Sequence, residues 1–248
     1  MSTASDISFV EATGSAFSRN RVVLTERGGG VSSAPFDTLN LGRSTPDDPA
    51  HVRANEARAL AALDAPDQVA RIQLEHGARI LPVGQPGVAG IGDALVTTEN
   101  SLVLSLSVAD CYPVALIEGS RRALVHCGWR CVAADILEGL FRGGTHDPSQ
   151  TVFTRPKETH VWIGPGIGAS CYPVGPEVGA RFPMSSKLHG DGQLVLDLNR
   201  EIRLRLLKIG IPTNQIESNG LCTACHPPRF FSHRRDGFPS GRMAAFFL

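Results

Sequence analysis

The chain has 248 residues, of which 42% are hydrophobic and 19% charged, a composition typical of a soluble globular protein with a substantial core. Its 24 basic and 24 acidic residues give a formal net charge of zero, which provides no electrostatic argument for binding nucleic acid or an anionic membrane. No apolar run reaches the length of a membrane-spanning helix, so the composition excludes an integral membrane protein of the helical class.

The first 15 residues contain acidic side chains and lack the basic and apolar segments of a secretory signal. We therefore expect a cytoplasmic protein, in which the six cysteines are more commonly thiols or metal ligands than disulfides. Internal repeats and low-complexity linkers are absent, which favours one domain over residues 1–248. The sequence carries no signal of an oligomeric state.

The predicted elements begin with short strands in residues 7–24, followed by a glycine-rich segment at 27–42. Three consecutive glycines after Arg27 exclude a regular element and leave two interpretations. One is a hairpin turn, and the other is a loop whose backbone N–H groups and Arg27 bind an anion such as phosphate. The Walker A spacing is absent. Asp47-Asp48-Pro49 then predicts the start of a helix that continues to about Leu63.

Residues 70–83 predict a strand, a bend at His76-Gly77 and a second strand, whereas the glycine-rich residues 85–92 predict a loop. A further strand begins at residues 93–97. The stretch 101–132 contains two strands that are apolar at nearly every position, as expected where both faces of a sheet are covered. Cys111 follows the first of these strands, and His126 lies at the end of the second.

The remaining elements alternate between strands and helices. Residues 132–144 predict a helix that follows a strand and a glycine turn, an arrangement that places functional groups at the carboxyl end of the strand. Four elements complete the chain: a strand running into a glycine-rich turn at 160–168, a helix capped by Asp197 that ends at Gly210, an edge strand at 211–220 and a final apolar strand at 243–248.

Three side chains supply the ligand types of a catalytic zinc centre: His76, Cys111 and His126. Zinc takes nitrogen and sulfur ligands, and catalytic sites usually combine three protein ligands with one open position. The long separations exclude a sequential zinc-finger motif, and each residue taken singly also fits an ordinary buried thiol or imidazole. The positions of Cys111 and His126, each directly before a turn, favour the metal interpretation.

The other cysteines receive simpler interpretations. Cys127 directly follows His126 on a strand, so its side chain is expected on the opposite face and in the core. Cys131 is interpreted as a small residue at a helix start. Cys222 and Cys225 belong to a CxxCH motif, the pattern of c-type haem attachment. Haem conflicts with an unexported chain and a structural zinc lacks a second ligand pair nearby, so a turn with free thiols is favoured.

The segment 230–237, FFSHRRDG, combines two aromatic residues with Arg234 and Arg235. Stacking rings and paired guanidinium groups suit an aromatic base or an anion. The segment equally fits a hairpin whose phenylalanines pack inside while the arginines are solvated or paired with Asp236.

Eight short segments, in this order along nearly the whole chain, carry a family resemblance: R-G-G-G-V-S at 27–32, T-L-N-L-G at 38–42, His76-Gly77, D-A-L-V-T at 93–97, A-D-C-Y-P-V at 109–114, H-C-G-W-R at 126–130, G-P-G-I-G at 164–168 and F-F-S-H-R-R-D-G at 230–237. Together they resemble the YfiH-like family, also called the multicopper polyphenol oxidoreductase (laccase-domain) or peptidoglycan editing factor family. The pair at 109–114 and 126–130 is specific to it.

The resemblance implies a single α/β catalytic domain with mixed β-sheets flanked by helices, a YfiH-like architecture of the cysteine-hydrolase type. It implies zinc bound by His76, Cys111 and His126. It also implies a purine nucleoside phosphorylase acting on adenosine, inosine, guanosine or methylthioadenosine, with adenosine deaminase activity at the same site. The expected partners are a small-molecule nucleoside and phosphate, with no nucleic acid and no membrane.

Two groups of site residues are expected. Cys111 and His126 would be catalytic as well as metal ligands, and Asp93 would transfer a proton or orient the ligands. The residues expected to bind the substrate or phosphate are Arg27, Asn40, Arg234 and Arg235.

Three alternatives stay open. Copper is the first, since it generally out-competes zinc at nitrogen and sulfur ligands and would suit a polyphenol oxidase; yet multicopper oxidases frequently use HxH pairs, and the eight histidines here form none. The second is a metal-free cysteine hydrolase or amidase acting on peptidoglycan precursors, with Cys111 as nucleophile and His126 as base. The third is a non-enzymatic protein that binds nucleotides or metal.

Overall fold

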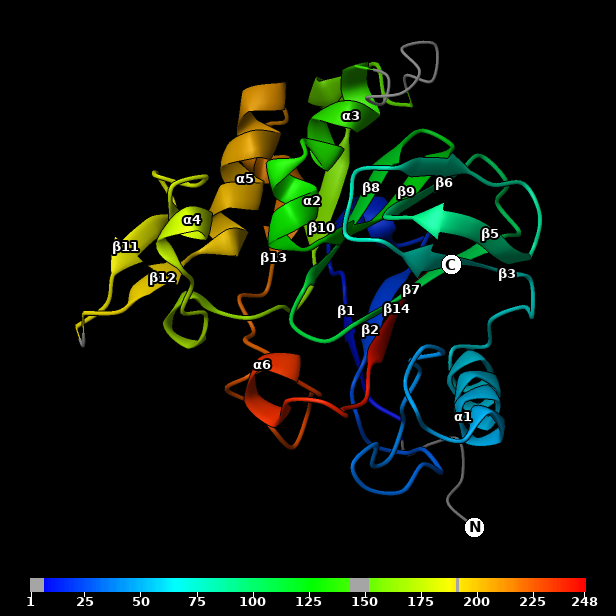
Figure 1. The fold of residues 1–248 in the computed structure, drawn as a ribbon. Helices are drawn as coiled ribbons and strands as arrows, with labels where there is room; N and C mark the ends of the chain where they lie inside the picture. The colour runs from blue at the N-terminus through cyan, green and yellow to red at the C-terminus, as the bar shows by residue number, and fades with distance from the viewer. Residues whose placement is uncertain (1–6, 143–151, 191) are drawn as a thin grey trace.

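Two six-stranded sheets form the centre of the protein, and the computed structural model describes residues 7–142, 152–190 and 192–248 (Figure 1). The first sheet contains, in spatial order, β1 (Phe9–Glu11), β2 (Val22–Thr25), β14 (Met243–Phe247), β7 (Val103–Val108), β3 (Val69–Leu74) and β5 (Gly87–Gly92). The second contains β13 (Ile216–Ser218), β10 (His160–Ile163), β8 (Tyr112–Glu118), β9 (Arg121–Cys127), β6 (Ala94–Thr97) and β4 (Ile80–Pro82). Both sheets mix parallel and antiparallel pairs, which confirms the mixed α/β class.

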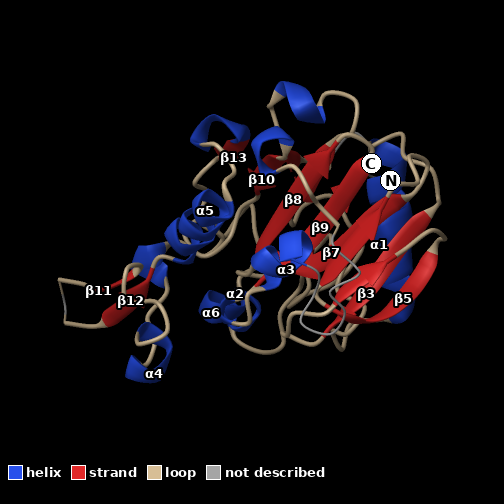
Figure 2. Ribbon diagram, turned by 90° about the horizontal axis from the view of Figure 1, so that it is seen from above, coloured by secondary structure: helices blue, strands red, loops and turns tan. Residues whose placement is uncertain are grey.

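The inner faces of the two sheets pack against each other, and helices cover both outer faces (Figure 2). Helix α1 (Pro49–Ala62) covers the first sheet. Helices α2 (Trp129–Ala133), α3 (Ile136–Arg142) and α5 (Leu198–Ile209) cover the second. Smaller elements are β11 (Ser186–Leu188), β12 (Leu194–Leu196), α4 (Pro176–Gly179), α6 (His233–Asp236) and the 3-10 turns η2 (Ser15–Phe17), η4 (Pro156–Glu158), η5 (Ala169–Cys171) and η6 (Thr213–Gln215).

Strand β8 shows why the apolar stretch of the sequence does not alternate. Val114 and Leu116 face the helices, while Ala115 and Ile117 face the first sheet. Successive side chains of a strand point to opposite faces, so a strand buried on both faces needs apolar residues throughout.

Strand β8 is a third strand besides the two predicted in 101–132, and it forms where the chain passes from the first sheet to the second after Val108. The prediction of a strand covered on both faces is confirmed at β9, where Ala123 and Val125 face the helices and Leu124 faces the first sheet.

Helix α1 begins where the sequence predicts. The Asp48 carboxylate accepts a hydrogen bond from the Ala50 N–H at 2.7 Å, and Pro49 occupies the first turn. Helix α5 is likewise capped by Asp197 and ends at Gly210, whose φ of +105° favours glycine. Within the described residues no helix is both long and apolar enough to span a bilayer.

Two predicted elements were wrong. Residues 87–92 form strand β5 instead of a loop, because their backbone pairs in parallel with β3 at the edge of the first sheet and glycine content does not prevent that pairing. The helix predicted over 132–144 is interrupted, because Asp135 adopts a left-handed φ of +59° and separates α2 from α3. Residues 143–144 of that prediction lie outside the described residues.

Three connections carry the chain from the first sheet to the second, and each bears a residue singled out from the sequence. His76 lies between β3 and β4, Asp93 between β5 and β6, and Cys111 between β7 and β8. Strands β7, β3 and β5 are adjacent and parallel, so their carboxyl ends meet at one edge of the sheet. The topology therefore gathers three distant residues in one place.

Candidate metal centre and active site

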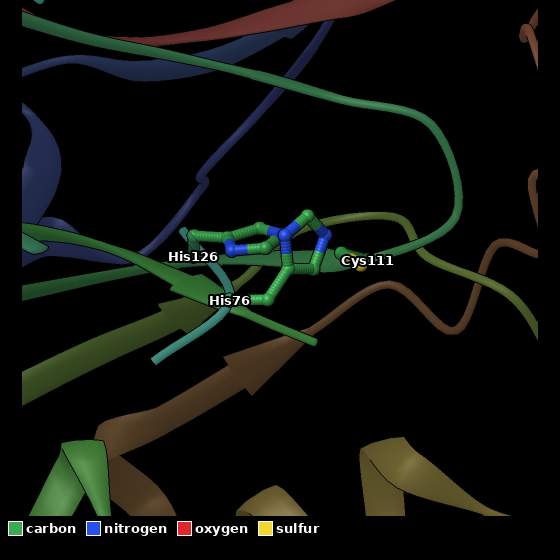
Figure 3. A group of neighbouring side chains, drawn as sticks. All are labelled: His76, Cys111 and His126. Atoms are coloured by element: carbon green, nitrogen blue, oxygen red, sulfur yellow. The ribbon is translucent and has the colours of Figure 1, made fainter. Parts of the chain in front are cut away.

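The side chains of His76, Cys111 and His126 converge at this edge (Figure 3). Their ligand atoms all lie within 4.8 Å of one another. The two imidazole rings stand edge to face, with centroids 4.9 Å apart. His126 reaches the site because β9 pairs with β8, which places His126 opposite Pro113, two residues after Cys111. The structure thus brings together all three predicted ligands.

Asp93 contacts both histidines of the cluster. Its buried carboxylate accepts hydrogen bonds from the backbone N–H groups of His76 and Gly77, at 3.0 and 2.7 Å. The same carboxylate lies 2.8 Å from Nδ1 of His126. A carboxylate at Nδ1 leaves Nε2 free to ligate a metal and fixes the orientation of the ring. Asp93 therefore positions both histidines.

Backbone strain marks the same place. His76 has a φ of +62° and Asp110 a φ of +87°, values that non-glycine residues rarely adopt. At His76, the hydrogen bonds that the Asp93 carboxylate accepts compensate for this strain. The Asp110 carboxylate accepts hydrogen bonds from Thr223 Oγ1 at 2.6 Å and from the Arg234 N–H at 2.7 Å. Such strain persists only where the surroundings stabilise it, and it concentrates at functional sites.

The motif at residues 126–131 packs tightly around the cluster. A side chain at Gly128 would place its Cβ 3.0 Å from the Cys111 sulfur, a tight contact that would press on the cluster. Cys127 points into the core between the second sheet and its helices, as predicted. Cys131, however, is more than a small helix residue, since its sulfur lies 3.5 Å from both the Asp93 carboxylate and His126 Nδ1.

The electrostatics of the metal-free chain favour a charged pair of thiolate and imidazolium. Burial raises the pKa of Cys111, but His126 and His76 outweigh it and lower the pKa to about 6. Burial lowers the pKa of His126, but Cys111, Asp93 and Cys131 together raise it well above its usual value. Burial raises the pKa of Asp93, yet its hydrogen bonds lower it overall. Cys111 is therefore ready to act as an anionic ligand or nucleophile.

The donor set fits a zinc ion. Two imidazoles and one thiolate are ligands that zinc prefers, and three protein ligands leave one position open, as in catalytic zinc sites. Asp93 supplies the outer carboxylate that ligating histidines commonly contact. His76, Cys111 and His126 would hold the ion.

A cavity of about 580 Å³ opens in front of the cluster. Its volume lies in the range of small-molecule sites. The wall contains both apolar and polar residues, including Leu74, Val108, Ser107, Arg71 and Arg242. Arg71 also pairs with Glu56 at 2.7 Å. The cavity therefore offers both an apolar surface and hydrogen-bond donors next to the cluster.

A smaller cavity of about 170 Å³ lies beside the first. His76, Ala109, Cys111 and His233 line both cavities, so the cluster stands between them. Tyr172 also lines the small cavity, and burial together with the nearby Cys111 raises its pKa to about 12, which keeps its hydroxyl protonated at neutral pH.

Two guanidinium groups of the small cavity have no carboxylate partner among the described residues. Arg130 stacks on the ring of Trp129 at 4.4 Å, with no hydrogen bond to another described residue. Arg234 lies 5.1 Å from the centroid of Tyr172 and donates to the carbonyl of Pro173 at 2.7 Å. Both keep donors available, so the small cavity is suited to an anion.

Arg27 lies elsewhere. Its guanidinium donates to the carbonyl of Asp37 at 2.9 Å, to the Asp37 carboxylate at 3.1 Å and to the carbonyl of Pro227 at 3.1 Å, and it stacks on Phe231. It lines neither cavity. The N–H groups of Gly30 and Val31 are also bonded within the chain, to Thr38 and Asn55. These contacts organise the loop itself.

Asn40 and Arg235 also make internal contacts. The buried Asn40 amide donates to Asp47 and accepts from the Arg242 N–H, both at 2.9 Å. Arg235 pairs with Asp236 and donates to carbonyls, including that of Phe230 at 2.9 Å. Of the four residues expected at the substrate or phosphate, only Arg234 lines a cavity beside the cluster.

Sequence reasoning missed Arg130 as a site residue. A signal was present, because Arg130 lies four residues after His126 and just after the glycine turn, in the first turn of α2. The residue at that position faces the end of the preceding strand. Arg242 was missed as well, since nothing in the sequence shows that the residue before β14 borders a cavity.

Comparison with known proteins identifies the family. Residues 21–248 match the family model described as multi-copper polyphenol oxidoreductase laccase. A Xylella fastidiosa protein named purine nucleoside phosphorylase is 37% identical over 242 residues, which cover 90% of each chain. The Escherichia coli protein named purine nucleoside phosphorylase YfiH is 34% identical over 228 residues, covering 88% of this chain and 89% of its own.

The fold agrees with solved structures. The crystal structure of YlmD from Geobacillus stearothermophilus superposes with a TM-score of 0.88 at 32% sequence identity, covering 96% of this chain and 95% of that one. The structure of YfiH from Bacillus licheniformis gives a TM-score of 0.85 at 28% identity, with 93% of each chain covered. The chain therefore belongs to the YfiH-like family, whose model carries the multi-copper polyphenol oxidoreductase laccase description.

Proposed function

We propose that the protein is a zinc-dependent purine nucleoside phosphorylase that also deaminates adenosine. One observation carries the proposal: the cluster of His76, Cys111 and His126 stands between a cavity of nucleoside size and a small cavity with two guanidinium groups that have no carboxylate partner among the described residues. Relatives that cover most of the chain are named purine nucleoside phosphorylases, which supports the substrate class.

The nucleoside occupies the large cavity. Its base lies against the apolar part of the wall, which includes Leu74 and Val108, and the ribose hydroxyls meet the polar part, which includes Ser107 and Arg242. A flat aromatic base gains affinity from apolar contact, while a few polar groups fix its orientation. This pose points the anomeric carbon of the ribose toward the small cavity.

Phosphate occupies the small cavity between Arg130 and Arg234. Guanidinium groups match phosphate oxygens in geometry and charge, and both side chains retain donors. The protonated hydroxyl of Tyr172 adds a third donor. Arg27, Asn40 and Arg235 stabilise the loops around the site, as their contacts indicate.

In phosphorolysis, a phosphate oxygen forms a bond to the anomeric carbon while the bond from that carbon to the purine nitrogen breaks. The electron pair goes to the purine, which takes up a proton and leaves as the free base with ribose 1-phosphate. His233 lines both cavities and supplies that proton. Arg130 and Arg234 hold the attacking phosphate in line, and positioning of this kind removes much of the barrier.

In deamination, water adds to the purine carbon that bears the amino group, and ammonia leaves to give inosine from adenosine. A zinc ion, when bound, supplies Lewis-acid chemistry and acidifies water toward a pKa of about 7. His76 and His126 are held in place by Asp93 for that purpose. The reaction needs no phosphate, so it does not depend on the small cavity.

The two activities provide a sharp test. We expect purified protein to convert adenosine and phosphate into adenine and ribose 1-phosphate, and adenosine alone into inosine and ammonia, both followed by chromatography. Arg130→Ala should raise the KM for phosphate by roughly 10-fold or more, because a hydrogen bond to a charged group contributes about 1.5–3 kcal/mol. Deamination by the same variant should stay within about twofold of the unmodified protein.

Arg53→Ala is the matched control, because Arg53 is an exposed arginine of α1 that lines neither cavity. It should leave both reactions unchanged. Absence of both products from zinc-loaded protein would contradict the proposal. An equal loss of both reactions in Arg130→Ala would contradict the phosphate position.

A metal-free cysteine hydrolase is the second candidate, favoured by one geometric observation. Cys111, His126 and Asp93 form a line of thiol, imidazole and carboxylate, with Asp93 2.8 Å from His126 Nδ1. Chelation separates the two proposals. Removal of metal should abolish nucleoside turnover, whereas a thiol hydrolase would keep or gain activity toward an amide substrate and lose it on alkylation of Cys111.

A further inference from the structure

A second group of thiols lies outside the site described above. Cys171 belongs to η5, while Cys222 and Cys225 follow β13, more than fifty residues along the chain. Their sulfur atoms all lie within 4.8 Å of one another, and those of Cys171 and Cys225 are 3.1 Å apart. The two cysteines of the CxxCH motif therefore lie beside a third cysteine, which the sequence alone did not indicate.

The backbone around Cys222 is arranged for a thiolate. The Gly168 N–H donates to the Cys222 sulfur at 3.1 Å. A Cβ at Gly168 would lie 3.1 Å from the Cys222 Cβ, which is a tight contact, so glycine eases this approach. An N–H donor on the sulfur lowers the cost of a negative charge there.

The arrangement favours a metal over a disulfide. The 3.1 Å between the sulfurs of Cys171 and Cys225 lies between the about 2.05 Å of a disulfide bond and the about 3.8 Å that separates two sulfurs bound to a tetrahedral zinc ion at about 2.3 Å, so the third thiol decides. A disulfide between Cys171 and Cys225 would leave Cys222, with its N–H donor, without a role. A cation that prefers sulfur uses all three.

We propose that Cys171, Cys222 and Cys225 form a second metal site, which takes a zinc-class cation through three thiolates and leaves one coordination position open. The three thiols release their protons as the cation binds. CxxC supplies two ligands from one turn, the spacing common in structural zinc sites, and Cys171 supplies the third from a neighbouring loop.

The site joins the loop of Ile167 and Tyr172, which line the small cavity, to the turn that contains Cys222 and Cys225. Residue 166 pairs with Cys222 through an isolated backbone bridge, and the Thr223 hydroxyl donates to Asp110, next to Cys111. Tyr172 directly follows Cys171. A bound cation therefore fixes the wall of the small cavity, although its binding does not depend on the reaction proposed above.

The test uses cobalt as a spectroscopic probe in the full chain, under reducing and anaerobic conditions. Cys111→Ala removes one thiol of the first site and leaves Cys131, whose sulfur lies 3.5 Å from His126, so loss of the thiolate-to-cobalt charge-transfer band on Cys171→Ser is what assigns the band to the second site. We expect metal-free Cys111→Ala protein to develop this band with one equivalent of Co²⁺, and equimolar Zn²⁺ to remove it. Adding Cys171→Ser should weaken cobalt binding by roughly 100-fold or more, since even outer partners of ligands contribute 10–100-fold.

Ser170→Ala in the Cys111→Ala background is the matched control, because Ser170 is the exposed neighbour of Cys171. It should leave the band unchanged. The proposal is overturned if Cys111→Ala protein develops no band, or if the band survives Cys171→Ser. It is also overturned if intact-mass analysis finds a Cys171–Cys225 disulfide, seen as the loss of two hydrogens, in place of bound metal.

A second measurement covers the event that Cys111→Ala protein fails to fold. Elemental analysis of otherwise unmodified, zinc-loaded protein should find two equivalents, and Cys225→Ser should retain one. Cys225 is exposed, so its replacement does not disturb the core. Equal zinc contents in Cys225→Ser and the unmodified protein would also overturn the proposal.

Discussion

The two cysteine-containing clusters are built on different supports. The cluster of His76, Cys111 and His126 stands at the ends of paired strands, with the buried Asp93 carboxylate behind it. The cluster of Cys171, Cys222 and Cys225 stands on two loops, where a backbone N–H group takes the place of a carboxylate. In the first, the fold imposes geometry on the ligands; in the second, bound metal would impose order on the loops.

This difference teaches what each cluster is suited to do. A reactive centre needs ligands whose positions stay fixed while substrate comes and goes, and paired strands provide that rigidity. Cross-linking of loops needs only soft ligands from two segments. On the two proposals, the same residue type would serve chemistry in one place and stability in the other, and four measurements test that division.

The largest expected effect is loss of the strand-based centre. Cys111→Ala should lower kcat/KM for adenosine phosphorolysis by roughly 1,000-fold or more, because it removes a ligand of a metal centre on which catalysis depends. It should also remove one equivalent of bound metal, measured by elemental analysis. Cys127→Ala is the control, because Cys127 follows His126 but points into the core on the opposite face of β9. This variant should lose about 1 kcal/mol of stability and keep its metal and activity. Full turnover by metal-free Cys111→Ala protein would refute the assignment.

Removal of the supporting carboxylate should have a smaller effect. Asp93→Asn should weaken zinc binding by about 10–100-fold, the usual range for the partners of ligating histidines. Saturating zinc should then restore much of the activity, which a merely unfolded variant would not show. Asp64→Asn, at an exposed turn with a φ of +52°, is the control and should bind zinc normally. Unchanged affinity in Asp93→Asn would remove Asp93 from the centre.

The acidity of the thiols should also separate the clusters. His126 and His76 outweigh burial and lower the pKa of Cys111 to about 6, so its thiolate is present above that pH and disappears below it. Hydrogen bonds with Cys171 and Cys222 raise the pKa of Cys225 to about 12, so it stays protonated near neutral pH. Iodoacetamide labelling of metal-free protein, mapped by mass spectrometry, should show a midpoint near pH 6 for Cys111.

His126→Ala is the informative variant in that experiment. Without the imidazole, the labelling midpoint of Cys111 should move up by about two pH units, toward the value of roughly 8.5 for an ordinary thiol. A midpoint that stays near pH 6 would show that another group stabilises the thiolate.

The smallest effect should follow loss of the loop-based cluster. Cys225→Ser should lower the Tm of zinc-loaded protein by about 2–8 °C, because losing about 1–2 kcal/mol shifts a domain of this size by about 2–4 °C per kcal/mol. Differential scanning calorimetry with and without a chelator provides the measurement. The chelator should add nothing further at this cluster in the variant, and an identical Tm would show that the cluster does not join the loops.

Local signals were sufficient for the paired strands and the capped helices. Asp48 and Pro49 predicted the start of α1, and the apolar positions of β9 predicted a strand covered on both faces. Strand β5 was missed because its pairing with β3 is a tertiary contact that glycine-rich residues do not reveal. The break at Asp135 was missed because no glycine or proline marks it.

The cluster of predicted metal ligands came together because each ligand follows a strand, and strands that are parallel neighbours end at one edge. Arg27 and Asn40 illustrate the limit. Their motifs suit a ligand equally well, and only the structure shows that their donors are used by neighbouring loops. Cys171 is a second example of this limit, since the two cysteines beside it, Cys222 and Cys225, lie 51 and 54 positions later in the chain.

The position of β14 has a consequence for synthesis of the protein. This strand, at residues 243–247, is inserted between β2 and β7, and Ala244 and Arg242 border the large cavity. Until these residues leave the ribosome, β2 and β7 present open edges, which are prone to pair with other chains. Sheet closure and completion of the cavity wall therefore both depend on β14. A chain that lacks this strand would lose part of the cavity wall and expose two open strand edges.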